Sequence, residues 1–497
     1  MKNRKIAEAL GEIDQAYIAQ AAQARRPRWI HWVSAAAAIL LVMLLVSTVW
    51  QHPRSQSDIV IQGTTPADLG EPSAIVSPNS AQFENLIGAP TYPQMVQMPI
   101  EKNYASKEEY ANAKSSWYFD QYRQYSQPEG YADSLSAFWH RSLTEFLSEQ
   151  TENAVFSPLN VYMAMAMLAE TAEGNSRQQI LDLFGADSIE ALRTQASHVW
   201  NAHYCADGAT TTVLANSIWL DQNFAYKQAA VDTLAQNYYA SVFHGKLGSK
   251  EMNGQLRQWI GSQTGNLLQD QTAELELDPD AAMALLSTLY FSATWENTFP
   301  ENQTVEAIFH SAGADIKTEF MNKTFDALTY YKGTNFGAIG LEMTGENTMW
   351  LILPHKGTTV DDVLASEEYM QMCTGIWKDK TVCKVHLSLP KFDVSGQMDL
   401  MEGMKRLGIT DVFDPTVSNF GAISEENLYV SKIDHACRVA VDEEGCVAAG
   451  YTLIIFKYGG AMPDSNQEIH FTLDRPFLFV VTSRDSLPLF AGVVNRP

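Results

Sequence analysis

The sequence has few cysteines and few basic residues, and each shortage excludes a class of function. Its five cysteines form no C-x-x-C pair and no Cys/His cluster at zinc spacing, so we expect no metal site and no cofactor. We interpret them mainly as small core residues; a disulfide between Cys373 and Cys383 is the alternative. The formal net charge of -24 argues against sequence-independent binding of nucleic acid, which needs clustered Lys and Arg.

Recognisable catalytic motifs are also missing. The chain has no G-x-S-x-G elbow, no H-E-x-x-H, no P-loop and no G-x-G-x-x-G between a strand and a helix. Its eleven histidines do not indicate a catalytic triad, because a sequence alone cannot show that distant side chains converge. We therefore predict that the chain is not an enzyme, and a membrane-tethered hydrolase is the weakest alternative.

A long apolar run lies near the N-terminus. Residues 29–50 read WIHWVSAAAAILLVMLLVSTVW, and as a helix these 22 residues would span about 33 Å, which matches a bilayer core of about 30 Å. Tryptophans stand at both edges, and basic residues are concentrated on the N-terminal side. We predict a cytoplasmic segment at 1–28 and a transmembrane helix at 29–50. A cleaved signal peptide is the alternative, but no small-x-small site follows Trp50.

The composition changes twice after the apolar run. Residues 51–131 are rich in Gln, Ser, Pro and Tyr without a sustained period, which predicts a flexible extracellular linker. Residues 132–497 have the pattern of a folded domain, with helical spacing early and alternating strand patterns late. Ser157 and Pro158 are suited to the start of a helix, as cap and first residue. This order indicates an α+β domain rather than repeated βαβ units.

Six segments of the folded region, in one order, resemble the serpin family of serine protease inhibitors. They are NAVFSPLNVYMAMAMLAETAEGNSRQQI, LANSIWLDQNF, LLSTLYFSATWENTF, LSLPKFDV, LYVSKIDHACRVAVDEEGCVAAGYT, and DRPFLFVV with LPLFAGVVNRP. The resemblance implies a serpin fold, in which N-terminal helices pack on a large mixed or antiparallel central sheet, with smaller sheets and an exposed reactive loop.

The resemblance also implies a mechanism and a hinge. In the family, a protease attacks the reactive loop, and the loop then inserts into the central sheet as a new strand. We predict the hinge at residues 443–452, with these principal positions: Glu443, Gly445, Cys446, Ala448, Ala449, Gly450 and Thr452. By the family's alternation, the inward side chains are all small: Cys446, Ala448, Gly450 and Thr452. An ordinary Ala/Gly turn after a strand is the alternative.

The sequence predicts the position of the cleaved bond less precisely than the position of the hinge. Family spacing puts it near Gly459, and the loop is several residues longer than usual. Cleavage after Tyr458 would suit chymotrypsin-like or subtilisin-like proteases, after Gly459 elastase-like ones and after Lys457 trypsin-like ones. We rank Tyr458 and Gly459 together, ahead of Lys457.

The resemblance also implies a group of residues where the central sheet must open, comprising Ser157, Asn160, Ser287, Trp295 and His435. The family usually has Ser where this chain has Asn160, and Asn where it has Ser287. We hypothesise that the two side chains have exchanged places within one buried polar network.

The sequence thus predicts a monomeric suicide-substrate inhibitor of an extracellular serine protease. The protease would be its covalent partner, and a membrane anchor would hold the domain outside a bacterial-type cell. A non-inhibitory serpin that acts as a cell-surface binding module is the alternative.

Overall fold

The computed structural model describes residues 82–311, 313–374, 376–377, 379–446 and 468–497. The chain divides into two compact units, Met1–Asp68 and Leu69–Pro497. The described residues all belong to the second unit. The predicted segments at 1–28 and 29–50 lie outside the described residues. Among the described helices, none is long and apolar enough to cross a membrane.

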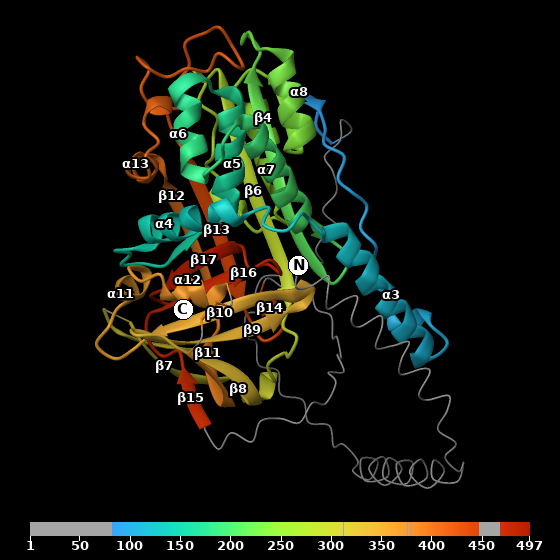
Figure 1. Cartoon of the computed structure of the whole chain (residues 1–497), viewed down its shortest axis with the longest axis vertical. Helices are drawn as coiled ribbons and strands as arrows, with labels where there is room; N and C mark the ends of the chain where they lie inside the picture. Colours follow the sequence, from blue (N-terminus) through green and yellow to red (C-terminus); the bar gives the residue numbers. More distant parts are fainter. Residues whose placement is uncertain (1–81, 312, 375, 378, 447–467) are drawn as a thin grey trace, which may run out of the picture. The chain divides into compact units, whose positions relative to one another are not determined.

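The larger strands form two sheets (Figure 1). The first, which we call the central sheet, has this strand order: β1 (Leu86–Gly88), β5 (Ala240–Gly245), β4 (Thr210–Asp221), β6 (Met283–Thr294), β14 (Gly445–Cys446), β13 (Asp434–Val441) and β12 (Phe392–Asp399), with β3 (Cys205–Ala206) beside β4. Its described pairs are antiparallel except β4 with β5.

The second sheet lies at the other end of the unit (Figure 1). Its strand order is β15 (Glu468–Thr472), β11 (Lys380–Pro390), β8 (Asp315–Lys332), β9 (Phe336–Met343), β10 (Asn347–Pro354), β16 (Phe477–Thr482), β17 (Pro488–Val494) and β2 (Ala154–Phe156), with β7 (Val305–His310) beside β8. β15 pairs with β11 in parallel, at the point where the chain returns from residues 447–467.

Helices cover the sheets and fill the space between them. The α-helices are α3 (Lys107–Tyr125), α4 (Ser136–Leu147), α5 (Pro158–Thr171), α6 (Gly174–Phe184), α7 (Ile189–His203), α8 (Gln228–Asn237), α9 (Lys250–Gln263), α10 (Gln269–Thr272), α11 (Val360–Leu364), α12 (Glu368–Cys373) and α13 (Met401–Arg406). The 3-10 helices are η1 (Glu101–Asn103), η2 (Asp133–Leu135), η3 (Glu301–Gln303), η4 (Thr344–Glu346) and η5 (Asp411–Phe413). The α+β organisation expected from the sequence, with helices packed on large sheets, is confirmed.

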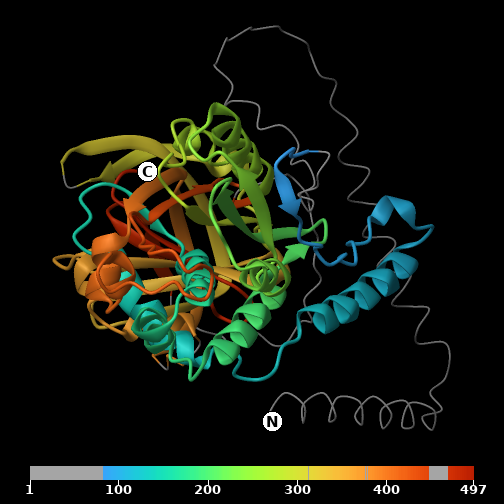
Figure 2. The same cartoon turned by 90° about the horizontal axis from the view of Figure 1, so that it is seen from above.

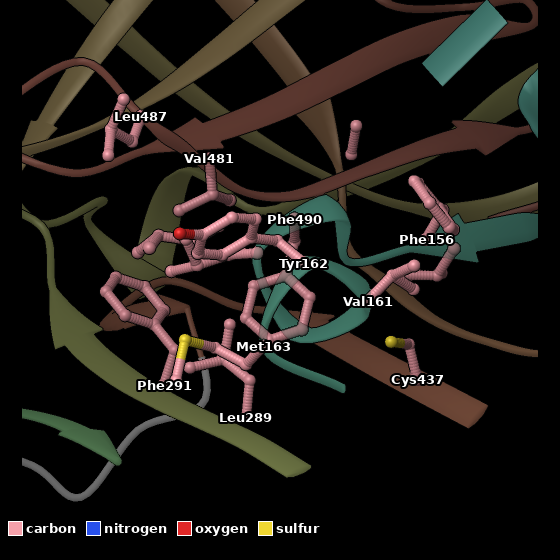
Figure 3. Close-up of a cluster of buried hydrophobic side chains, with 14 of the residues drawn as sticks. Phe156, Val161, Tyr162, Met163, Leu289, Phe291, Cys437, Val481, Leu487 and Phe490 are labelled. Atoms are coloured by element: carbon pink, nitrogen blue, oxygen red, sulfur yellow. The ribbon is translucent and has the colours of Figure 1, made fainter. Parts of the chain in front are cut away.

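Helix α5 is buried on nearly all sides and lies between the two sheets. It begins as the sequence predicts, with the Ser157 side chain accepting a hydrogen bond from the Asn160 amide and Pro158 in the first turn. Its Tyr162 packs in one cluster with Phe291 of β6 and Phe490 of β17 (Figure 3). A helix that is apolar all round must be covered on every face, and the two sheets provide that cover.

One expectation is wrong in part. The linker prediction fails for residues 82–131, since this stretch contains β1 and α3, and its Phe83 and Trp117 are buried. The apolar residues of this stretch are too sparse to form a core of their own, but the domain supplies the surface that buries them. The alternative disulfide is also absent, because Cys373 and Cys383 are both free and buried.

Candidate functional site

The turn between β13 and β14 is built on the side chain of Asp442. Its carboxylate oxygen accepts hydrogen bonds from the backbone amides of Glu444 (2.9 Å) and Gly445 (3.1 Å). The Asp442 amide in turn donates to the Gly445 carbonyl, also over 3.1 Å. An aspartate that binds the amides two and three residues ahead stabilises a tight turn. The chain therefore reverses at the first hinge residues and enters the central sheet.

Strand β14 lies between β6 and β13. Gly445 is opposite Thr294 of β6, and Cys446 is opposite both Ala293 of β6 and Val441 of β13. The approach at Gly445 is close enough to require glycine, because a Cβ there would lie 2.3 Å from the Ala293 carbonyl oxygen. In the described part of the sheet, β6 and β13 are joined through β14 alone. The two hinge residues thus mark a site where a strand enters between β6 and β13.

Cys446 is the inward hinge residue that the structure describes. It is 2% exposed, and its side chain belongs to the main hydrophobic core. Burial, assisted by the nearby Asp442 charge, raises the pKa of its thiol to about 12. The thiol is therefore protonated at neutral pH and acts as a small apolar side chain.

Trp295 ties the end of β6 to the turn. Its backbone amide donates to the Glu444 carbonyl, and its indole Nε1 donates to the Asp442 carbonyl, each over 2.9 Å. The Phe299 amide completes the group by donating to the Glu443 carbonyl over 2.9 Å. Three donors from one segment thus hold three successive carbonyls of the turn.

The Glu443 carboxylate is held by two side chains. It accepts hydrogen bonds from Thr304 Oγ1 over 2.7 Å and lies 3.0 Å from Lys391 Nζ. Partial burial on its own would raise the pKa of Glu443, but the hydrogen bonds from Thr304 and Lys391 outweigh burial and lower it. Glu443 is therefore ionised at neutral pH and fixes the first residue of the hinge outside the sheet.

Ser157 and His435 form a second polar group, beneath the central sheet. The Ser157 amide donates to His435 Nε2 over 3.1 Å, and Ser157 Oγ donates to the Leu489 carbonyl over 2.7 Å. Cys437 Sγ lies 3.2 Å from the same histidine nitrogen. Burial lowers the pKa of His435 to about 4, so the ring is neutral at pH 7 and accepts at Nε2.

Asn160 and Ser287 do not share a network in the way we hypothesised. No hydrogen bond among the described residues joins their side chains. Ser287 is instead opposite Asn216 in the pairing of β4 with β6. Ser287 Oγ and Asn216 Oδ1 are both buried without a hydrogen-bond partner in the described part of the chain. Two buried oxygens without a partner are costly to the folded state.

The predicted group of five residues divides between two places. Trp295 joins the hinge, whereas Ser157 and His435 form the group under the sheet. Ser287 and Trp295 are eight positions apart, which corresponds to about 26 Å along an extended strand. The remaining predicted positions lie outside the described residues: Ala448, Ala449, Gly450, Thr452, Lys457, Tyr458 and Gly459.

Sequence reasoning missed the residues that hold the hinge. Asp442 could have been found, since an aspartate before Glu-Glu-Gly is a common turn signal. Thr304 gave no signal, and Lys391 was quoted only as part of LSLPKFDV, because the contacts of both with Glu443 join distant parts of the chain. Among the described residues, no group of three or more His, Cys, Asp or Glu side chains is arranged to hold a metal ion.

The folded domain as a whole is similar to known proteins. The family model described as "Serpin (serine protease inhibitor)" matches residues 134–497, more than half of the chain. An alpha-1-antitrypsin-like protein from Tamias sibiricus is 28% identical over 358 residues, which cover 70% of this chain and 84% of the relative. The plasma serine protease inhibitor of Bos taurus is 27% identical over 362 residues, with coverages of 70% and 86%.

The fold of this chain is also similar to that of solved structures. The crystal structure of tengpin, a thermophilic serpin, in its native state superimposes with a TM-score of 0.65 at 24% identity. That alignment covers 75% of this chain and 95% of tengpin.

Proposed function

The chain belongs to the serpin family, whose members are commonly protease inhibitors rather than enzymes, and from this premise we propose that it is a suicide-substrate inhibitor of an extracellular serine protease. The observation that carries the proposal is the position of Gly445 and Cys446 between β6 and β13. The reactive loop would occupy residues 447–467 and end at β15, where the chain rejoins the second sheet.

In the proposed reaction, the protease treats the loop as a substrate. The hydroxyl oxygen of the protease serine attacks the carbonyl carbon of the scissile residue and forms an ester bond, while its proton passes to the departing amine. The peptide C–N bond breaks, and the loop residue stays bound to the protease as an acyl group. Insertion of the loop before water reaches the ester would displace the protease's catalytic groups, and a shift of about 1 Å costs about a hundredfold in rate.

The register of β14 defines where an inserted loop would lie. Continued antiparallel pairing would bring Ala448 opposite Phe291 and Val439. Two residues further along, Gly450 would lie opposite Leu289 and Cys437. A new strand of about 15 residues, with hydrogen bonds worth roughly 0.5–1.5 kcal/mol each, would gain on the order of 10 kcal/mol. This gain would make the trapped state effectively irreversible.

The same register gives a place for Thr452, the last predicted inward residue. It would lie opposite Ser287 on one side and His435 on the other. Ser287 Oγ has no hydrogen-bond partner among the described residues, and an inserted threonine hydroxyl would supply one. The cost of the unsatisfied oxygen would thus be removed on insertion, which adds to the driving force.

The N-terminal segments complete the proposal. Residues 29–50 would anchor the chain as a single span, with residues 1–28 in the cytoplasm and the inhibitor outside a bacterial-type membrane. The apolar length, the flanking tryptophans and the basic residues before the run support this topology. A similar inhibitor, that of Bos taurus, is named for plasma.

Incubation with a panel of proteases tests the function. The full chain is mixed with chymotrypsin-like, subtilisin-like, elastase-like and trypsin-like enzymes, and products are separated under denaturing conditions. We expect a covalent complex and a released C-terminal peptide whose mass shows cleavage after Tyr458 or Gly459. Cleavage without a complex for every protease would favour the non-inhibitory binding module instead.

A further inference from the structure

Strand β15 follows residues 447–467 and attaches the end of the proposed reactive loop to the second sheet. It is an edge strand, since among the described strands it pairs with β11 alone. It lies near the lower end of the unit in Figure 1, on the side away from the viewer in Figure 2. Its Phe471 is buried and meets the ring of Tyr330 edge to face, with centroids 6.1 Å apart. The strand is therefore held along one edge and by one face.

Two histidines lie side by side on the other face of this strand pair. His386 of β11 is opposite His470 of β15 in the parallel pairing. The two imidazole rings are stacked, with centroids 4.6 Å apart and planes inclined by 15°. The His386 side chain is 30% exposed and His470 is exposed, so protons from solvent reach both rings. The register of the strands thus holds two titratable rings in contact.

Glu468 is the carboxylate that contacts this pair. One of its oxygens lies 3.1 Å from Lys384 Nζ, and the other lies 3.5 Å from His386 Nε2. The hydrogen bonds from Lys384 and His386 lower the pKa of Glu468, so it stays ionised at mildly acidic pH. Among the described residues, no ion pair joins His470 to a carboxylate. Glu468 therefore supports a positive charge on His386 rather than on both rings.

Strand β8 adds one more charge on this face. Its Thr324 is opposite His386, and Thr324 Oγ1 lies 3.1 Å from His386 Nδ1. Asp326 lies in the bulge of β8 that faces Lys384, and it is exposed. The charges that face the pair from β8, β11 and β15 are therefore one lysine and two carboxylates, and the lysine offsets one of the carboxylates.

Protonation changes the balance of charge in this cluster. Histidine side chains take up their proton between about pH 8 and pH 5. The first proton is accommodated on His386, beside Glu468. A second proton, on His470, brings two positive rings to a centroid distance of 4.6 Å, and like charges that close disfavour each other. Separation of β15 from β11 removes the repulsion, so the separated state binds protons more readily and is favoured as the pH falls.

We propose that the stacked His386 and His470 rings make the attachment of β15 to β11 sensitive to pH. Neutral rings hold the strand, and doubly protonated rings loosen it. Because β15 follows residues 447–467, acid would also loosen the C-terminal end of the proposed reactive loop and so reduce inhibition. That consequence rests on the proposed function, whereas the attachment of β15 to β11 does not.

Hydrogen exchange of the full chain at pH 7.5 and pH 5.5 tests the attachment. Exchange rates of the peptide containing β15 are corrected for the intrinsic effect of pH on exchange. They are compared with the rates of β16, which lies inside the same sheet. Two variants, His386→Gln and His470→Gln, each remove one ring of the pair. His355→Gln is the matched control, because it makes the same change at a histidine that directly follows β10.

We expect the exchange rate of β15 in the unaltered chain and in His355→Gln to rise about tenfold between pH 7.5 and pH 5.5, while that of β16 stays constant. The two variants of the pair should lose most of this rise, since a single imidazole has no charged ring beside it. An equal rise in His470→Gln, no rise in the unaltered chain, or a parallel rise in β16 would overturn the proposal. His470→Gln decides alone if His386→Gln does not fold.

A second measurement separates this proposal from the proposed function. The unaltered chain is kept at pH 7.5 or at pH 5.5, returned to pH 7.5 and mixed with protease, and the yield of covalent complex is compared. We expect a lower yield after pH 5.5, and a smaller reduction for His470→Gln. If the chain forms no complex even when it is kept at pH 7.5, the proposed function fails, while hydrogen exchange still decides the attachment of β15.

Discussion

The indole nitrogen of Trp295 donates a hydrogen bond to the backbone carbonyl of Asp442 over 2.9 Å. This bond joins the end of β6 to the turn that leads into β14. The two residues are far apart in the sequence, yet they meet where a strand enters the central sheet. The hinge is therefore held by β6, the strand along which the loop is proposed to insert.

Replacing Trp295 by Phe tests this bond. The variant keeps an aromatic ring but removes the donor to the Asp442 carbonyl in a partly buried hydrogen bond, so we expect the free energy of unfolding to fall by about 0.5–1.5 kcal/mol. Trp377→Phe is the control, because its indole donates to the Lys332 carbonyl at an exposed site. Denaturant unfolding measures both variants, and equal losses would contradict a special role for Trp295.

Gly445→Ala tests the close approach of β14 to β6. The added methyl would lie 2.3 Å from the Ala293 carbonyl oxygen, so β14 must move away from its position. We expect proteases to cleave the loop of this variant at a normal rate while the yield of covalent complex falls strongly, since the proposed insertion begins at this residue.

The control for Gly445→Ala is Gly254→Ala in α9, where a Cβ meets no atom within 4 Å. That change should stabilise the helix by about 0.5–1 kcal/mol and leave the complex unaffected. A full yield of complex from Gly445→Ala would show that β14 need not pair closely with β6.

His435 predicts a pH dependence of stability. Its pKa is about 4 in the folded protein against 6.5 in the unfolded chain, so only the unfolded state binds the proton between these values. Stability is therefore complete above pH 6.5 and declines as the pH falls towards 4, by about 2–3 kcal/mol at pH 4.5 from this residue.

The His435→Gln variant isolates that contribution from carboxylates that titrate in the same range. Urea unfolding of both proteins at pH 7 and pH 4.5 should show a smaller loss for the variant by that amount. His310→Gln removes an exposed histidine, 2.8 Å from Asp315 Oδ1, and controls for the loss of a histidine elsewhere in the chain. Parallel losses in all three proteins would refute the assignment to His435.

Local signals in the sequence predicted much of the fold. The Ser157-Pro158 start of α5 and the buried face of β11 follow from capping and from period-two alternation, which act over a few residues. The fold of residues 82–131 was missed because Phe83 and Trp117 are buried by surfaces of the domain rather than by their sequence neighbours. Composition reports whether a segment can fold alone, not whether another segment will cover it.

The sequence predicted the site only in part, because some of its contacts join residues that are far apart in the chain. Family resemblance predicted the hinge at residues 443–452, and the described part of it, Glu443–Cys446, lies against Trp295. The contact between Glu443 and Thr304 spans 139 positions of the chain and has no local signal. The relation of Asn160 to Ser287 was misjudged because it depends on the pairing of β6 with β4.

The most direct test of the account compares two arginine substitutions in the loop, Ala448→Arg and Ala449→Arg. Alternation gives Ala448 an inward and Ala449 an outward side chain, so only the first change would bury an unpaired charge, which costs several kcal/mol. We predict that a protease that forms the covalent complex with the unaltered chain will form it with Ala449→Arg but will simply cleave Ala448→Arg. Equal yields of complex from the two variants would contradict insertion of this loop into the central sheet.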